Sequence, residues 1–64
     1  MLNKLIEWER SNGYKAKFIA EKLGLSEAQY SKMKRGQLKP SLEVAERLEK
    51  EFNITNVYDL LKDY

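Results

Sequence analysis

The sequence has no cysteine and no histidine, and only one proline and three glycines in 64 residues. The first two absences exclude disulfides, nucleophile–base pairs built on either residue and the usual structural zinc sites, which leaves only carboxylates as plausible metal ligands. A chain this short buries only about 60% of the surface that its unfolded form exposes, so its core is thin and a deep cleft is not expected. We therefore expect one domain, residues 1–64, that is not an enzyme and holds no cofactor or metal.

Long apolar runs are also missing. No segment approaches the roughly 20 apolar residues that cross a bilayer. The opening residues, MLNKLIEW, lack the apolar run of about 7–15 residues that marks a signal peptide. A cysteine-free chain also suits a reducing compartment, so we expect a cytoplasmic protein without membrane contact.

The charges are unevenly distributed along the chain, although the net charge is only +2. Residues 15–39 carry seven basic and two acidic side chains, a net charge of +5. Residues 40–64 carry three basic and six acidic side chains, a net charge of −3. A molecule polarised in this way can orient itself against a polyanion.

Helical periodicity recurs along the chain and predicts an all-α fold of five helices. The first helix ends at the turn-forming residues 11–13, and the second and third span 15–23 and 27–35. Ser41 caps a fourth helix after Pro40, and Thr55 or Asn56 caps a short fifth one. The apolar positions expected to face inward are Leu2, Leu5, Ile6 and Trp8 in the first helix, Leu38 in the connection before Pro40, Leu42, Ala45, Leu48 and Phe52 in the fourth helix, and Val57, Leu60 and Leu61 in the fifth.

Residues 19–36, IAEKLGLSEAQYSKMKRG, form the most informative segment. Gly24 ends one helix, and Ser26 with Gln29 forms a capping box that begins the next. At 100° per residue, Tyr30 and Met33 share the inner face of helix 27–35. Its opposite face is small, polar and basic, with Ala28, Ser31, Lys32 and Arg35. The segment from about 15 to 36 therefore predicts a helix-turn-helix, which seats its second helix in a DNA groove.

The chain resembles the phage-repressor-like (Cro/Xre type) helix-turn-helix family. The matching residues are Ile19 to Ser26, Tyr30-Ser31, Arg35-Gly36, Pro40-Ser41 and Leu60-Leu61. The resemblance implies a compact five-helix lambda-repressor-like domain. It also implies base contacts from Ser26, Glu27, Ala28 and Lys32, and phosphate contacts from Lys15, Ala16, Lys17, Arg35, Gln37 and Lys39.

Two positions depart from the family pattern. The family often has a glutamine at the start of the second helix, where Ala16 stands here, and Lys15 and Lys17 are the obvious substitutes for its phosphate contact. The family also often pairs a glutamate near the end of the third helix with an arginine of the first. Here Lys34 and Glu9 occupy those places, so we predict an ion pair of reversed polarity between the first and third helices.

Several side chains have two interpretations from the sequence. Lys32 can donate to guanine or contact a phosphate or solvent. Glu27 can accept from cytosine or favour the helix through its dipole, and Ala28 can touch a thymine methyl or simply let the backbones approach. Ser31 favours a phosphate or solvent contact over a base contact. Phe18 lies off the apolar stripe of its helix, where either a neighbouring helix half covers it, the interpretation that we favour, or it belongs to an interface.

The main functional hypothesis is a sequence-specific regulator that binds double-stranded DNA through helix 27–35 in the major groove. It is expected to be a small repressor of a phage, plasmid or mobile element, associated with the bacterial nucleoid. A homodimer on two half-sites is expected, with an interface formed by Val57, Tyr58, Leu61 and Tyr64. The alternative for these four residues is that they pack internally or lie in solvent. The alternatives are an accessory DNA-architectural factor in recombination, and an adaptor or antirepressor that binds a protein through Trp8, Tyr14 and Phe18.

Overall fold

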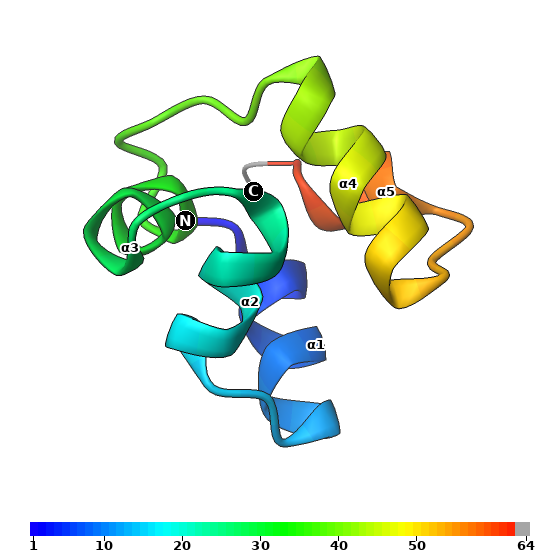
Figure 1. Ribbon diagram of the computed structural model, residues 1–64. Helices are drawn as coiled ribbons and strands as arrows, with labels where there is room; N and C mark the ends of the chain where they lie inside the picture. Colours follow the sequence, from blue (N-terminus) through cyan, green and yellow to red (C-terminus); the bar gives the residue numbers. More distant parts are fainter. Residues whose placement is uncertain (63–64) are drawn as a thin grey trace.

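The computed structural model describes residues 1–62, and Figure 1 shows the chain as a bundle of short helices with no strand in the described part. The helices are α1 (Asn3–Asn12), α2 (Ala16–Leu23), α3 (Glu27–Lys34), α4 (Leu42–Phe52) and α5 (Val57–Leu60). The predicted all-α fold of five helices is confirmed. The predicted bounds shift by one residue at two ends, because Lys15 is the N-cap of α2 and Arg35 the C-cap of α3.

The helix ends follow from local sequence. Gly13 and Gly24 end α1 and α2 in the left-handed conformation, with φ of 69° and 73°, which glycine adopts without a steric penalty. Asn53 ends α4 in the same conformation with φ of 56°. The Ser41 hydroxyl accepts a hydrogen bond from the Val44 amide at 3.2 Å and caps α4 as predicted. Asn56 is the N-cap residue of α5, but its side chain makes no capping hydrogen bond.

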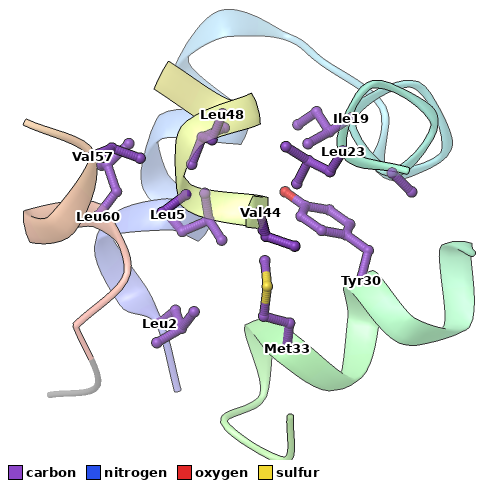
Figure 2. Close-up of a cluster of buried hydrophobic side chains, with 12 residues drawn as sticks. Leu2, Leu5, Ile19, Leu23, Tyr30, Met33, Val44, Leu48, Val57 and Leu60 are labelled. Atoms are coloured by element: carbon purple, nitrogen blue, oxygen red, sulfur yellow. The ribbon is translucent and has the colours of Figure 1, made fainter. Parts of the chain in front are cut away.

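One apolar cluster, to which all five helices or their flanking residues contribute, holds the domain together (Figure 2). The buried apolar residues are Leu2, Leu5, Ile19, Ala20, Leu23, Tyr30, Met33, Val44, Ala45, Leu48, Val57 and Leu60. In this cluster α2 packs against both α3 and α4, and α1 packs against α3 and α5. The α2–α3 pair is therefore supported by α1, which packs against α3, and by α4, which packs against α2.

Two residues predicted to face inward do not. Leu42 is 64% exposed, because the inner face of α4 runs through Val44, Ala45 and Leu48 and the first residue of the helix lies at its edge. Leu38 is 38% exposed, in the segment between α3 and α4. Both predictions were wrong, and both side chains border a surface groove described below.

Candidate nucleic-acid interface

The turn between α2 and α3 is fixed by backbone and side-chain hydrogen bonds. The amide of Leu25 donates to the carbonyl of Ala20 at 2.9 Å, and the amide of Gly24 donates to that of Glu21 at 3.2 Å. This pairing closes the end of α2 as a Schellman motif. The Leu25 side chain, in the turn between the two helices, is half-buried and packs against the core.

The start of α3 has the predicted capping box. The Gln29 amide donates to Ser26 Oγ at 3.1 Å, and the Ser26 amide donates to Gln29 Oε1 at 2.9 Å. Two amides that would otherwise lack a partner are satisfied reciprocally. Together with the Schellman motif, the capping box fixes the backbone where α2 ends and α3 begins.

The inner face of α3 carries Tyr30 and Met33, which are 0% and 1% exposed. The four side chains predicted to read bases, Ser26, Glu27, Ala28 and Lys32, are all exposed on the first turns of this helix. Arg35, the C-cap residue, is exposed as well. The structure therefore leaves the outer face of α3 open, as docking in a DNA groove requires.

The predicted phosphate-binding residues lie at the two ends of the helix-turn-helix. Lys15 and Lys17 are exposed at the start of α2, and Gln37 and Lys39 are exposed in the segment after α3. Ala16 is half-buried. Because the N-cap residue of α2 makes no side-chain capping bond within the described chain, amides of the first turn remain available to an anion. Ser31 is half-buried, as Ala16 is, and it borders a small hollow beside Met1 and Ile6.

The distribution of charge in space follows the distribution along the chain. Figure 1 shows α3 and α4 on opposite sides of the view, with α2 between them. The excess of basic residues belongs to α2, α3 and the segment that follows them, whereas α4 carries exposed glutamates at 43, 46 and 49. The positive side of the molecule is therefore the side that carries the outer face of α3, an arrangement that favours contact with a polyanion.

A partly buried ion pair braces α3 from behind. Lys34 Nζ lies 2.9 Å from Glu9 Oε2, and the two side chains are 18% and 12% exposed. The predicted pair of reversed polarity between α1 and α3 is thereby confirmed. The same ammonium lies 4.8 Å from the centre of the Tyr30 ring, so the cation also contacts the inner face of α3.

Two polar atoms behind α3 are buried without a hydrogen-bond partner among the described residues, the Tyr30 hydroxyl and Glu9 Oε1. Burial is the main reason that the pKa of Tyr30 lies above its ordinary value, and the negative charge of Glu9 raises that pKa further. In the folded protein Tyr30 therefore loses its proton at a higher pH than an exposed tyrosine does.

Four aromatic rings meet on the side of α2 that faces α1 and α4. Trp8, Tyr14 and Phe18, which the sequence suggested as a protein-binding patch, do come together, with ring centres 5.4 Å apart for Trp8–Tyr14 and 5.6 Å for Tyr14–Phe18. Phe52 joins all three, at 5.1 to 6.1 Å. We call these four residues the aromatic patch. The role of Phe52 was missed because its helical spacing assigned it to the core and nothing local links it to Tyr14.

A groove of about 550 Å³ lies between the segment 36–41, the start of α4 and α5. Its lining includes Leu38, Leu42, Tyr58 and Leu61, and Tyr58 is 62% exposed. Two of the residues predicted for a dimer interface, Tyr58 and Leu61, therefore border the same surface. Val57 does not, because it is 2% exposed inside the core, and its assignment to an interface is corrected. Tyr64 lies outside the described residues.

Comparison with protein families agrees with this geometry. The helix-turn-helix family model, of the Cro/C1 type, matches residues 7–58, which is most of the chain. The chain belongs to this helix-turn-helix family, whose members are DNA-binding transcription regulators. Comparison with curated proteins and with solved structures gave no match. Within residues 1–62, no helix is long and apolar enough to traverse a bilayer.

Proposed function

We propose that the protein is a sequence-specific regulator that binds double-stranded DNA with α3 in the major groove. The observation that carries the proposal is the division of α3 into two faces. Tyr30 and Met33 fix its inner face in the core, and the outer face, from Ser26 to Lys32, is exposed and fits a groove about 12 Å wide.

The base-reading residues are Ser26, Glu27, Ala28 and Lys32. Lys32 donates to the O6 and N7 acceptors of guanine, and Glu27 accepts from the amino group of cytosine. Ala28 contacts a thymine methyl group and is small enough to let the helix approach the bases. The Ser26 hydroxyl accepts the capping bond from Gln29 and retains its own proton to donate to a base or a phosphate.

The phosphate contacts come from both sides of the recognition helix. Lys15 and Lys17, at the start of α2, bind the DNA backbone in place of the glutamine that the family often has at the position of Ala16. Arg35, Gln37 and Lys39 bind the DNA backbone beyond α3. Ser31 is proposed for a phosphate as well, although its partial burial limits it to an approach along the α1 side. Such contacts fix the register of the protein on DNA and carry no direct sequence information.

The regulator acts as a homodimer on DNA. The molecule measures 25 × 24 × 23 Å, so one copy spans less than the roughly 34 Å of one helical turn and reaches few bases. Two copies on half-sites about a turn apart supply the missing specificity. Tyr58 and Leu61, with Leu42 across the groove, offer an exposed apolar surface for the dimer contact.

Occupation of a promoter by this dimer blocks access to it, so repression, as for a small phage, plasmid or mobile-element regulator, is the mode of action that we propose. No second activity is needed for such control, because mass action on operator occupancy suffices.

The test is selection of bound duplexes from a random pool, followed by affinity measurements with two lysine variants. Lys32→Ala should weaken binding to the selected duplex by about 1–3 kcal/mol and relax the base preference at one position. Lys39→Ala should weaken all duplexes alike and reduce the salt slope by about 1. Lys50→Ala, on the opposite side of the molecule in α4, serves as the control and should change neither. A pool that shows no preferred sequence, or a Lys32→Ala variant with unchanged preference, would contradict the proposal.

A further inference from the structure

The aromatic patch is a rigid surface with a buried base and an exposed face. Trp8 and Phe52 are half-buried and pack edge to face, with ring centres 5.1 Å apart. Tyr14 and Phe18 lie above them and are 37% and 42% exposed. Because the four rings come from α1, the α1–α2 turn, α2 and α4, the tertiary fold fixes their arrangement, and little ordering is needed when a partner binds.

Positive charge borders the exposed face. Phe18 and Lys22 are four residues apart in α2 and share one face of it, and Tyr14 precedes the helix with its ring centre 5.6 Å from that of Phe18. Lys22 Nζ lies 5.6 Å from the centre of the Phe18 ring. Lys15 and Lys17, which precede Phe18, belong to the proposed phosphate contacts, so Lys22 is the cation that we assign to the aromatic patch, and Glu21 is the acidic residue of α2.

The patch is separate from the proposed DNA-binding surface. Its rings belong to α1, α2, α4 and the α1–α2 turn, and none of its residues belongs to α3 or is assigned a base or phosphate contact. The core described above is complete without Tyr14 and Phe18. Two large aromatic side chains therefore remain partly in water at a place where neither the core nor DNA recognition requires them.

We propose that the aromatic patch binds a short acidic segment of another protein. One aromatic or large aliphatic side chain of that segment covers Tyr14 and Phe18, and a carboxylate of the segment pairs with Lys22. Aromatic anchors beside a cation are suited to such a contact, because the rings supply affinity and the charge supplies selectivity and speed of encounter.

The position of Lys22 favours an acidic segment over a single-stranded nucleic acid. Stacking of a base requires the open face of an aromatic ring, whereas the ammonium of Lys22 already lies over the ring of Phe18. The ammonium of Lys22 still has N–H groups that can donate hydrogen bonds to a carboxylate. A carboxylate can therefore bind Lys22 without displacing it from the ring.

The fluorescence of Trp8 can report peptide binding to the aromatic patch, because Trp8 is the single tryptophan and it contacts Tyr14 and Phe52. The probe is a short synthetic peptide in which glutamates flank one phenylalanine. The matched control peptides replace the glutamates with lysines or the phenylalanine with alanine. We expect the acidic peptide to change the Trp8 emission saturably, to shift the amide signals of residues 14–22, and to bind more weakly as salt is added, while neither control peptide does so.

Variants of the protein locate the binding site. Phe18→Ala and Lys22→Gln should each weaken the acidic peptide by about tenfold, the size of a modest interface hot spot. Lys50→Gln in α4 is the matched control and should bind as the unaltered protein does. If Phe18→Ala proves unfolded, Phe18→Leu, which keeps the apolar volume but loses the ring, replaces it. All of these variants should bind duplex DNA normally, so failure here is distinguishable from failure of the DNA-binding proposal.

Three outcomes would overturn the proposal. The first is no saturable change with the acidic peptide, or equal binding of the lysine peptide. The second is a Trp8 response to an oligothymidylate strand in place of the peptide, which would assign the patch to nucleic acid. The third is a Trp8 emission that depends on protein concentration without peptide and loses this dependence in Phe18→Ala, which would assign the patch to a second copy of the chain.

Discussion

Glu9 of α1 and Lys34 of α3 form an ion pair with 2.9 Å between Oε2 and Nζ. At the same place the amide of Leu2 donates to the carbonyl of Lys34 at 2.8 Å. One residue at the end of α3 is thus held through both its side chain and its backbone. Since α3 carries the proposed base-reading residues on its other face, the pair fixes the orientation of that face relative to the domain.

Loss of the ion pair should destabilise the domain more than loss of an exposed one. Glu9→Gln leaves the Lys34 ammonium partly buried without its counter-ion, and we expect a loss of about 2 kcal/mol in the free energy of unfolding. The double variant Glu9→Lys with Lys34→Glu should recover most of it. Urea denaturation measures all three. Lys4→Gln is the control, since the Lys4–Asp59 pair is 46% and 36% exposed and should contribute less than about 1 kcal/mol. Equal losses for Glu9→Gln and Lys4→Gln would contradict this ranking.

The ion pair illustrates what the sequence could predict. The five helices, the capping box and the faces of α3 follow from periodicity and cap residues, which are local signals. The pair itself was predictable because the family resemblance supplies which positions of α1 and α3 face each other. The contacts of Phe52 with Tyr14 and Phe18 had no such guide, because they join residues distant in the chain. The exposure of Leu42 follows from the inner face of α4, which includes the buried Val44 that the sequence prediction left out and which leaves Leu42 at the edge.

Gly24 should tolerate a side chain less well than Gly13. Both glycines end a helix with positive φ, so alanine at either position should cost about 1–2 kcal/mol. A Cβ at Gly24 would also lie 2.6 Å from Nη1 of Arg47, whereas a Cβ at Gly13 would meet nothing within 4 Å. The excess cost of Gly24→Ala should be small, because the end of the arginine side chain can move.

A double-variant cycle isolates the contact with Arg47. In an Arg47→Ala background, Gly24→Ala should cost as much as Gly13→Ala does, because only the backbone penalty remains. Thermal or urea unfolding gives each value. An excess cost at Gly24 that persists without Arg47 would mean that strain in the turn, and not the arginine, distinguishes the two positions.

Buried Tyr30 should make the domain sensitive to alkali. Its pKa is raised in the folded state, first by burial and then by the charge of Glu9, above the ordinary value of 10.0 that applies to the unfolded chain. The stabilisation is therefore complete below pH 10 and falls above it, by up to about 1.4 kcal/mol per pH unit, as the unfolded state alone loses the proton. Tyr30→Phe should lack this component, so its stability should fall less steeply between pH 10 and pH 11 in parallel urea titrations.

At neutral pH the same variant tests the cost of the buried hydroxyl. The Tyr30 hydroxyl has no hydrogen-bond partner among the described residues, so Tyr30→Phe removes no hydrogen bond and should change stability by less than about 1 kcal/mol. A loss above about 2 kcal/mol would show that the hydroxyl is bonded in solution, and the carboxylate of Glu9, which raises the pKa of Tyr30, is the candidate acceptor.

The exposed apolar residues beside the groove should determine self-association. Tyr58→Ser and Leu42→Ser each remove an exposed apolar side chain, 62% and 64% accessible, so both should leave the free energy of unfolding within about 0.5 kcal/mol. Both should weaken the dimer, measured by sedimentation equilibrium, and with it the affinity for a two-half-site duplex more than for a single half-site. Val57→Ala should do the opposite. It lies in the core, so it should cost about 1–3 kcal/mol in stability while leaving the association of the folded fraction unchanged. If the two serine variants associate as the unaltered protein does, the dimer contact lies elsewhere, and the preference for paired half-sites will reveal whether a dimer forms at all.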